Sequence, residues 1–172
     1  VASNQKDNKI DWVQKEKDFY SIINKYKKPE GQEGYDCLIP VSGGKDSTYQ
    51  AYFMKVKCGL NPLCVCFETT LMTDLGRENL DNLSKMGIDV IFFKKNYNVY
   101  KLLVVEGFKR VGDEMWPNHL GIFTIPINIA VKFNIPLVIW GENSQQEYGG
   151  PEESVEKNHL DRRWLEEFGG LL

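Results

Sequence analysis

Residues 35–47 read YDCLIPVSGGKDS. In this stretch an apolar run ends abruptly in Ser-Gly-Gly-Lys-Asp-Ser, and a helix-compatible segment follows. This is the pattern of a buried strand that leads through a glycine-rich turn to the N-terminus of a helix. Such a turn offers several backbone N–H groups and the positive end of a helix dipole to a phosphate group. The stretch therefore predicts a strand, an anion-binding turn and a helix.

The residue types of the turn suit a phosphate and its metal ion. The two glycines let the backbone approach the anion, the two serines add hydroxyl donors, and Lys45 adds a point charge. A carboxylate beside bound phosphates usually holds Mg²⁺, which explains Asp46. A simple helix cap is the alternative, but a cap needs fewer of these residues. We therefore expect a binding site formed by Ser42, Gly43, Gly44, Lys45, Asp46 and Ser47, with Asp46 as metal ligand.

Short apolar strands alternate with helical patterns along the rest of the chain. The alternation predicts an α/β fold with an open, doubly wound parallel sheet of the Rossmann-like type. We expect an N-terminal helix and connector over residues 1–34 and one domain over 35–172. The predicted strands are 35–41, 62–67, 88–93 and 136–140, and the predicted helices are 10–26, 45–58, 74–86, 98–111, 119–133 and 152–168.

Ligands of such sheets bind beyond the carboxyl ends of the strands. The polar stretch 140–150 begins at the end of the last predicted strand, so it is the second candidate site. Its carboxylates suit Mg²⁺ binding or proton transfer, and its amides and phenol suit sugar hydroxyls. A solvated loop would also be polar, and the sequence leaves that alternative open.

Five further residues are weaker candidates. Arg77 and Asn79 open a predicted helix, where they either reach a ligand or lie on the surface. His119 stands at another predicted helix start and is either catalytic or structural. The pair Lys94-Lys95 follows the third predicted strand; it either lies on the surface or attracts phosphate.

Composition narrows the class of protein. The 172 residues suit one domain with a full core, and 42% hydrophobic and 26% charged residues are ordinary for a globular protein. The net charge of −3 argues against nucleic acid as the main partner. No apolar run is long enough for a bilayer and no signal peptide is evident, so we expect a cytoplasmic protein with no membrane partner. The chain lacks an initiator methionine, and we expect it to be a fragment.

The cysteine pattern predicts buried, reduced thiols. Cys37, Cys64 and Cys66 lie in predicted strands, and Cys64 and Cys66 share one strand face. The fourth cysteine, Cys58, ends a predicted helix. A metal site would favour Cys-x-x-Cys pairs, and the sequence contains none.

The turn resembles the PP-loop of ATP pyrophosphatases, Ser-Gly-Gly-x-Asp-Ser, which holds ATP phosphates during cleavage to AMP and pyrophosphate. Further blocks resemble the N-acetyl sugar amidotransferases of bacterial surface-polysaccharide and nonulosonic-acid biosynthesis, including lipopolysaccharide O-antigen. The resemblance covers residues 35–168. The blocks are Thr69-Thr70, GRENL at 76–80, PLVIWGEN at 136–143 and EYGG at 147–150.

The resemblance implies ATP-dependent conversion of a sugar acetamido group to an acetamidino group, with ATP and Mg²⁺ as cofactors and ammonia from a glutaminase partner. It implies catalytic roles for Lys45, Asp46 and Glu142. The backbone of Val65 and Phe67 would pair with adenine. It also implies that Gly141 and Asn143 line the nucleotide side, and that Glu147, Tyr148 and Arg77 meet the sugar.

One departure and two alternatives stay open. Members of that family usually carry a cysteine-rich segment ahead of the PP-loop and continue further, whereas this sequence starts without that segment and stops earlier, as expected either of a fragment or of a reduced member. A PP-loop enzyme that adenylates a tRNA base before thiolation or amination is the main alternative. A nucleotide-binding domain without turnover is the other. Neither a serine–histidine–acid order nor a nucleophilic cysteine stands out.

Overall fold

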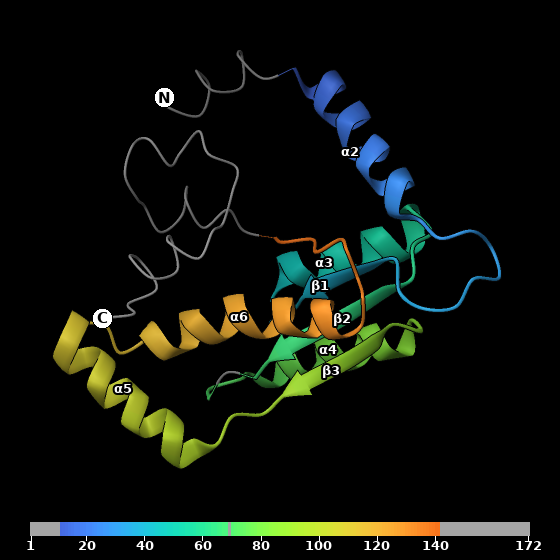
Figure 1. The fold of residues 1–172 in the computed structure, drawn as a ribbon. Helices are drawn as coiled ribbons and strands as arrows, with labels where there is room; N and C mark the ends of the chain where they lie inside the picture. Colours follow the sequence, from blue (N-terminus) through green and yellow to red (C-terminus); the bar gives the residue numbers. More distant parts are fainter. Residues whose placement is uncertain (1–10, 69, 142–172) are drawn as a thin grey trace, which may run out of the picture.

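The structure is a computed structural model that describes residues 11–68 and 70–141. It is an α/β fold around an open parallel sheet in the order β1-β2-β3 (Figure 1). The strands are β1 (Cys37–Pro40), β2 (Pro62–Phe67) and β3 (Asp89–Phe93). The helices of the described residues are α2 (Trp12–Tyr26), α3 (Lys45–Tyr52), α4 (Asp74–Lys85), α5 (Tyr97–Val111) and α6 (Trp116–Lys132), with a π-helix, η1, at Phe53–Lys57.

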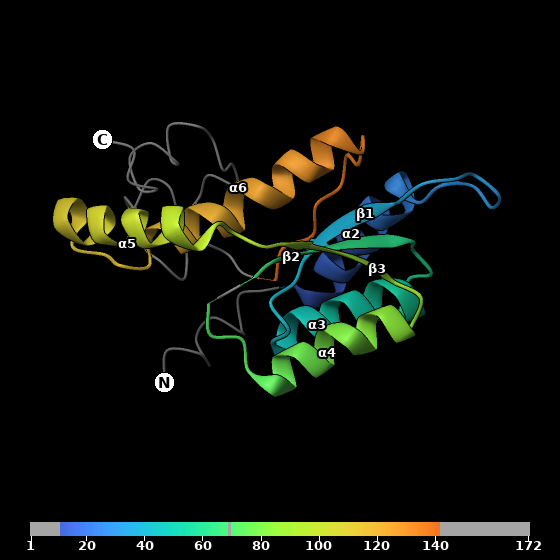
Figure 2. The ribbon, with the colours of Figure 1, turned by 90° about the horizontal axis from the view of Figure 1, so that it is seen from below.

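Helices cover both faces of the sheet, which is why the central strand is apolar throughout. Every residue of β2 is buried. One face packs on α3 and α4, and the other on α6 (Figure 2). Alternate residues of a strand point to opposite faces. Ile39 and Cys64 accordingly belong to one core cluster with Leu80 and Leu83, whereas Leu38 and Leu63 belong to the other.

The fourth predicted strand, 136–140, is not a strand of this sheet. It forms a single parallel bridge with β1, in which the Leu38 N–H donates to the Leu137 carbonyl and the Ile139 N–H donates to the Leu38 carbonyl. The next bond of that ladder would need an N–H at position 40. Pro40 has none, so the pairing stops there.

Two helix boundaries also differ from the prediction. The helix expected over 45–58 changes to a π-helix after Tyr52, and it ends before Gly59, whose φ of +65° suits a helix stop. The helix expected from His119 starts three residues earlier, because Pro117 occupies its first turn, where a proline is tolerated. His119 therefore lies one turn inside α6 instead of at its start.

The prediction of buried, reduced thiols is confirmed. The thiols of Cys37, Cys64 and Cys66 are free and buried, and Cys58 is half-buried. Burial raises the pKa of Cys37 and of Cys64 to about 12 each. No helix among the described residues combines the length and the apolar character needed to cross a membrane.

Candidate functional site

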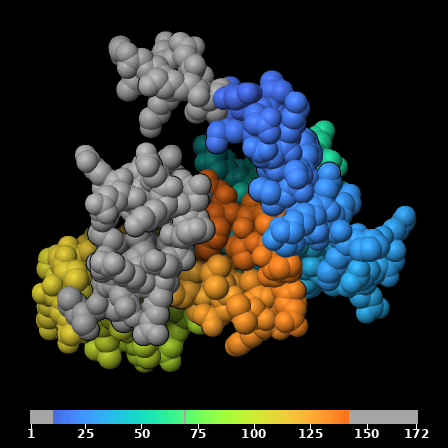
Figure 3. Space-filling model, turned by 45° about the horizontal axis from the view of Figure 1, so that its top comes forward, coloured from blue at the N-terminus to red at the C-terminus, as the bar shows by residue number. Residues whose placement is uncertain are grey.

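A cleft of about 510 Å³ lies at the carboxyl edge of the sheet. This volume is within the range of small-molecule sites. The glycine turn forms one end, and α6 and the strand ends form the rest. The segment between α6 and Gly141 comes to the surface in the middle of one face (Figure 3). The lining residues are Pro40, Val41, Ser42, Gly44, Lys45, Asp46, Ser47, Val65, Phe67, Ile122, Pro126, Trp140 and Gly141.

The start of α4 holds the glycine turn in place. Gly43 has a φ of +79°, and a side chain there would collide with the carbonyl of Gly76. The Asn79 side-chain amide donates to the Gly43 carbonyl at 2.8 Å. The turn therefore needs glycine at position 43 for both its backbone angle and its close approach to α4.

Hydroxyl groups fix the far side of the turn. Ser47 Oγ and Thr48 Oγ1 donate to the Gly44 carbonyl at 3.2 and 2.8 Å. The N–H groups of Ser42 and Gly44 make only long bonds of 3.3 Å, to Ser47 Oγ and Ser42 Oγ. Because these bonds are weak, both N–H groups are available to a stronger acceptor such as a phosphate oxygen.

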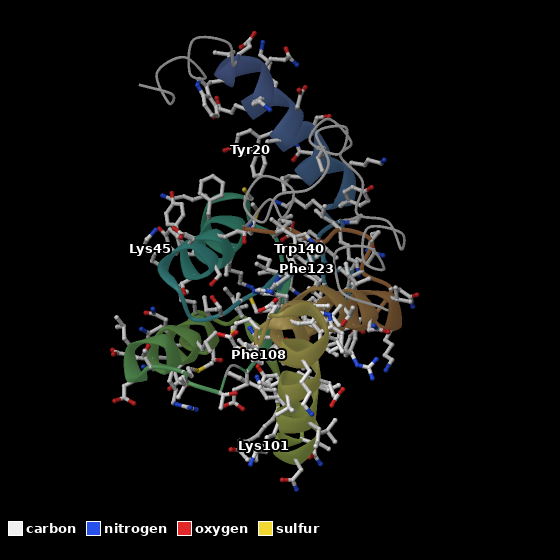
Figure 4. The ribbon with its side chains drawn as sticks, turned by 90° about the vertical axis from the view of Figure 1, so that its left-hand side faces the viewer. Tyr20, Lys45, Lys101, Phe108, Phe123 and Trp140 are labelled. Carbon is white, nitrogen blue, oxygen red and sulfur yellow. The ribbon has the colours of Figure 1, made fainter. Side chains whose placement is uncertain are left out.

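Lys45 and Asp46 form an exposed ion pair on the first turn of α3. Their side chains are 89% and 78% exposed, and Lys45 Nζ lies 2.7 Å from Asp46 Oδ1. Figure 4 places Lys45 at the periphery of the molecule, whereas Phe123 and Trp140 lie near its centre. An exposed pair of this kind contributes little stability. Both groups can therefore turn to a ligand at low cost.

Asp46 supplies a carboxylate of the kind that can hold a magnesium ion. Mg²⁺ is usually held by one or two carboxylates together with substrate phosphates and water. No group of three or more His, Cys, Asp or Glu side chains within residues 11–68 and 70–141 would hold a metal ion by itself. The donor set thus suits an ion shared between Asp46 and phosphate oxygens.

The end of β2 offers a backbone edge to a ligand. The Val41 N–H donates to the Val65 carbonyl, and the Glu68 N–H donates to the Phe93 carbonyl. Successive residues of a central parallel strand bond to opposite neighbours. Phe67 therefore directs its N–H and carbonyl toward the β1 side, past the point where β1 has ended. The Val65 carbonyl already accepts the Val41 N–H, so the backbone of Phe67 is the better hydrogen-bond partner for a ligand.

The Phe67 ring is held by three neighbours. It stacks on Phe93 with ring centroids 5.7 Å apart, and its tip abuts Gly121, where a side chain would collide with it. Lys95 Nζ lies 4.8 Å from the Phe67 centroid and 3.9 Å from that of Tyr100. This ammonium is buried without a hydrogen-bond partner among the described residues, and burial lowers the pKa of Lys95 although the charge of Glu68 opposes the shift. Lys95 is thus a packed cation rather than part of a surface pair.

Several predicted site residues lie away from the cleft or outside the described residues. The Arg77 side chain is 59% exposed and pairs loosely with Glu68 at 3.9 Å. His119 Nδ1 lies 3.7 Å from Asp113 Oδ2. Neither residue lines the cleft. The remaining predictions fall outside the described residues, namely Glu142, Asn143, Glu147 and Tyr148.

The sequence interpretation missed the contribution of α6. Ile122 and Pro126 line the cleft, and Phe123 of the same helix packs at 5.4 Å on the ring of Trp140, which the candidate stretch already included. A proline inside an otherwise helical stretch was the available signal. Asn79 was considered as a ligand contact, but its position shows it supporting Gly43.

Comparison with known proteins gives little further information. No protein-family model matches the chain. An uncharacterized protein of Methanocaldococcus jannaschii is 34% identical over 82 residues, which are 47% of this chain and 29% of that protein. The match thus spans less than a third of that relative's length.

Proposed function

We propose that this chain binds ATP and adenylates the amide oxygen of an N-acetyl sugar, which ammonia then converts to an acetamidino sugar. The observation that carries the nucleotide part is the glycine turn, which joins weakly bonded N–H groups to the exposed Lys45–Asp46 pair at a cleft. The sugar part rests on the resemblance of the blocks at 136–143 and 147–150 to N-acetyl sugar amidotransferases.

The topology supports an ATP site of the PP-loop type. The chain passes from β1 to β2 on one side, and the segment 136–140 returns on the other side of β1. Ligands of doubly wound sheets bind where the strand order reverses in this way. The cleft lies between the ends of β1 and that segment. We propose that the complete sheet is doubly wound.

The chemistry needs two displacements. The amide oxygen attacks the α-phosphorus of ATP, the bond to the β-phosphate oxygen breaks, and pyrophosphate leaves. Ammonia then attacks the activated carbon, AMP leaves with the original amide oxygen, and a proton passes to a base. Lys45 and the turn N–H groups would stabilise the negative charge that develops on pyrophosphate. Bound Mg²⁺, held by Asp46, would neutralise phosphate charge.

Product analysis tests the proposal. The protein, in its longest natural form, is incubated with ATP, Mg²⁺, ammonium and a panel of free and nucleotide-linked acetamido sugars, with bulk tRNA in parallel. AMP and pyrophosphate that appear only with one sugar and ammonium are the expected result. AMP that appears with tRNA instead would establish the tRNA-modifying alternative. ATP binding without turnover on any substrate would favour the non-catalytic alternative.

The thiols favour the amidotransferase over a thiolating enzyme. Thiolation needs reactive thiolates, which form where the pKa is low and the sulfur accessible. Cys37, Cys64 and Cys66 are buried, and burial raises the pKa of Cys66 to about 11. Substitution of all three by alanine or valine should leave AMP formation with sugar intact if the protein folds.

A further inference from the structure

Helix α6 carries a proline where a helix tolerates it least. Pro126 lies in the interior of α6 and its side chain is fully buried. A proline there has no N–H for the carbonyl four residues earlier. That carbonyl belongs to Ile122. Ile122 and Pro126 both line the cleft, as residues four apart on one helix face do.

The same turn of α6 carries side-chain hydrogen bonds to its backbone at neighbouring positions. Thr124 Oγ1 donates to the Leu120 carbonyl at 2.7 Å, and such a bond tends to bend a helix. The Asn128 amide donates to the Thr124 carbonyl at 2.9 Å. Side chains thus donate to the carbonyls of Leu120 and Thr124, whereas the carbonyl of Ile122, a residue that lines the cleft, lacks its usual helical donor. Local rules are most often broken at functional sites.

We propose that the Ile122 carbonyl accepts a hydrogen bond from the nucleoside half of the bound nucleotide, and that Pro126 determines specificity by keeping this acceptor free. The inference rests on ATP as the ligand of the cleft. The neighbouring Gly121 abuts Phe67, so this turn of α6 lies at the Phe67 end of the cleft, away from the glycine turn. The donors that a nucleoside brings there are the exocyclic amine of adenine and the two ribose hydroxyls.

Binding of ATP analogues to two proteins tests this acceptor. Dissociation constants are measured with Mg²⁺ for ATP, 2′-deoxy-ATP, 3′-deoxy-ATP and purine riboside triphosphate, which lacks the exocyclic amine. The proteins are the natural chain and Pro126→Ala, which restores the N–H. We expect one analogue to bind the natural chain about tenfold more weakly than ATP, as the loss of one hydrogen bond predicts. The same analogue should show no penalty in Pro126→Ala.

A matched control separates this effect from general damage. Pro117→Ala changes a proline in the first turn of the same helix, where no intrahelical bond is lost, and it should leave every affinity unchanged. Pro126→Ala gains helix propensity but loses the contacts of a buried ring, so its unfolding temperature is measured beside that of the natural chain to show that it folds. An analogue that is penalised equally in both proteins has its donor recognised elsewhere, and the inference fails if every penalty is of that kind.

The remaining outcomes also decide the question. If the natural chain binds all three analogues as tightly as ATP, the inference fails even if Pro126→Ala does not fold. If the natural chain does not bind ATP at all, the proposed function fails first. The two failures are therefore distinguishable.

Discussion

Two aspartates flank β1 and have opposite surroundings. Asp36, before the strand, is 6% exposed, and its carboxylate accepts the backbone N–H groups of Lys28 at 2.7 Å and Asn61 at 2.6 Å. Asp46, beyond the strand, is 78% exposed and bonds to its neighbour Lys45. A buried carboxylate with both oxygens bonded joins chain segments, whereas an exposed one at a cleft is available to a ligand. The comparison separates a structural from a functional role for one residue type.

The largest effect that the comparison predicts is on activity. On the proposed function, Asp46→Asn should lower pyrophosphate release about 1,000-fold, because it removes the carboxylate charge proposed to hold Mg²⁺ beside the phosphates. The urea midpoint of unfolding should not change, since the exposed pair contributes little stability. Lys45→Ala should behave in the same way. Near-normal turnover in both variants would remove these residues from the site.

The matched change at Asp36 should affect stability instead. Asp36→Ala leaves the backbone N–H groups of Lys28 and Asn61 without their acceptor, at about 1–3 kcal/mol for each buried group. We expect a loss of about 3 kcal/mol in the free energy of unfolding, measured by urea denaturation. Asp46→Ala is the control and should lose almost nothing. Equal losses in the two variants would contradict the comparison.

The buried thiols of the sheet, like Asp36, should affect stability. The folded-state pKa of Cys37 and Cys64 is raised from 9.0 to about 12. A raised pKa gives stability that is complete below pH 9 and is lost as the pH rises toward 12. The free energy of unfolding should therefore fall by about 1.4 kcal/mol per thiol for every pH unit above 9. Urea midpoints between pH 8 and 11 would measure this slope, and Cys64→Ala should reduce it more than Cys58→Ala.

The sequence predicted what local chemistry determines. A strand, a turn and a helix are specified by the apolar residues before Ser42 and the two glycines after it. Strand β2 could be predicted from its apolar residues alone. The sequence could not predict that Pro40 ends the pairing with 136–140, because that depends on which strand lies beside β1. For the same reason the sequence could not predict that Lys95 lies over the Phe67 ring or that this ring stacks on Phe93. Each contact joins residues that are distant in the chain.

The smallest predicted effect tests a residue that the sequence interpretation assigned to the sugar. Arg77 lies outside the cleft, and its pair with Glu68 at 3.9 Å is long and half-exposed. Arg77→Ala should therefore change the free energy of unfolding by less than about 0.5 kcal/mol and leave the ATP dissociation constant unchanged. Asn79→Ala, two residues on, is the matched contrast, because it removes the bond to the Gly43 carbonyl and should weaken ATP binding. If instead Arg77→Ala raises the KM for the sugar without altering ATP affinity, the arginine reaches substrate from outside the cleft, and the start of α4 serves substrate as well as the glycine turn.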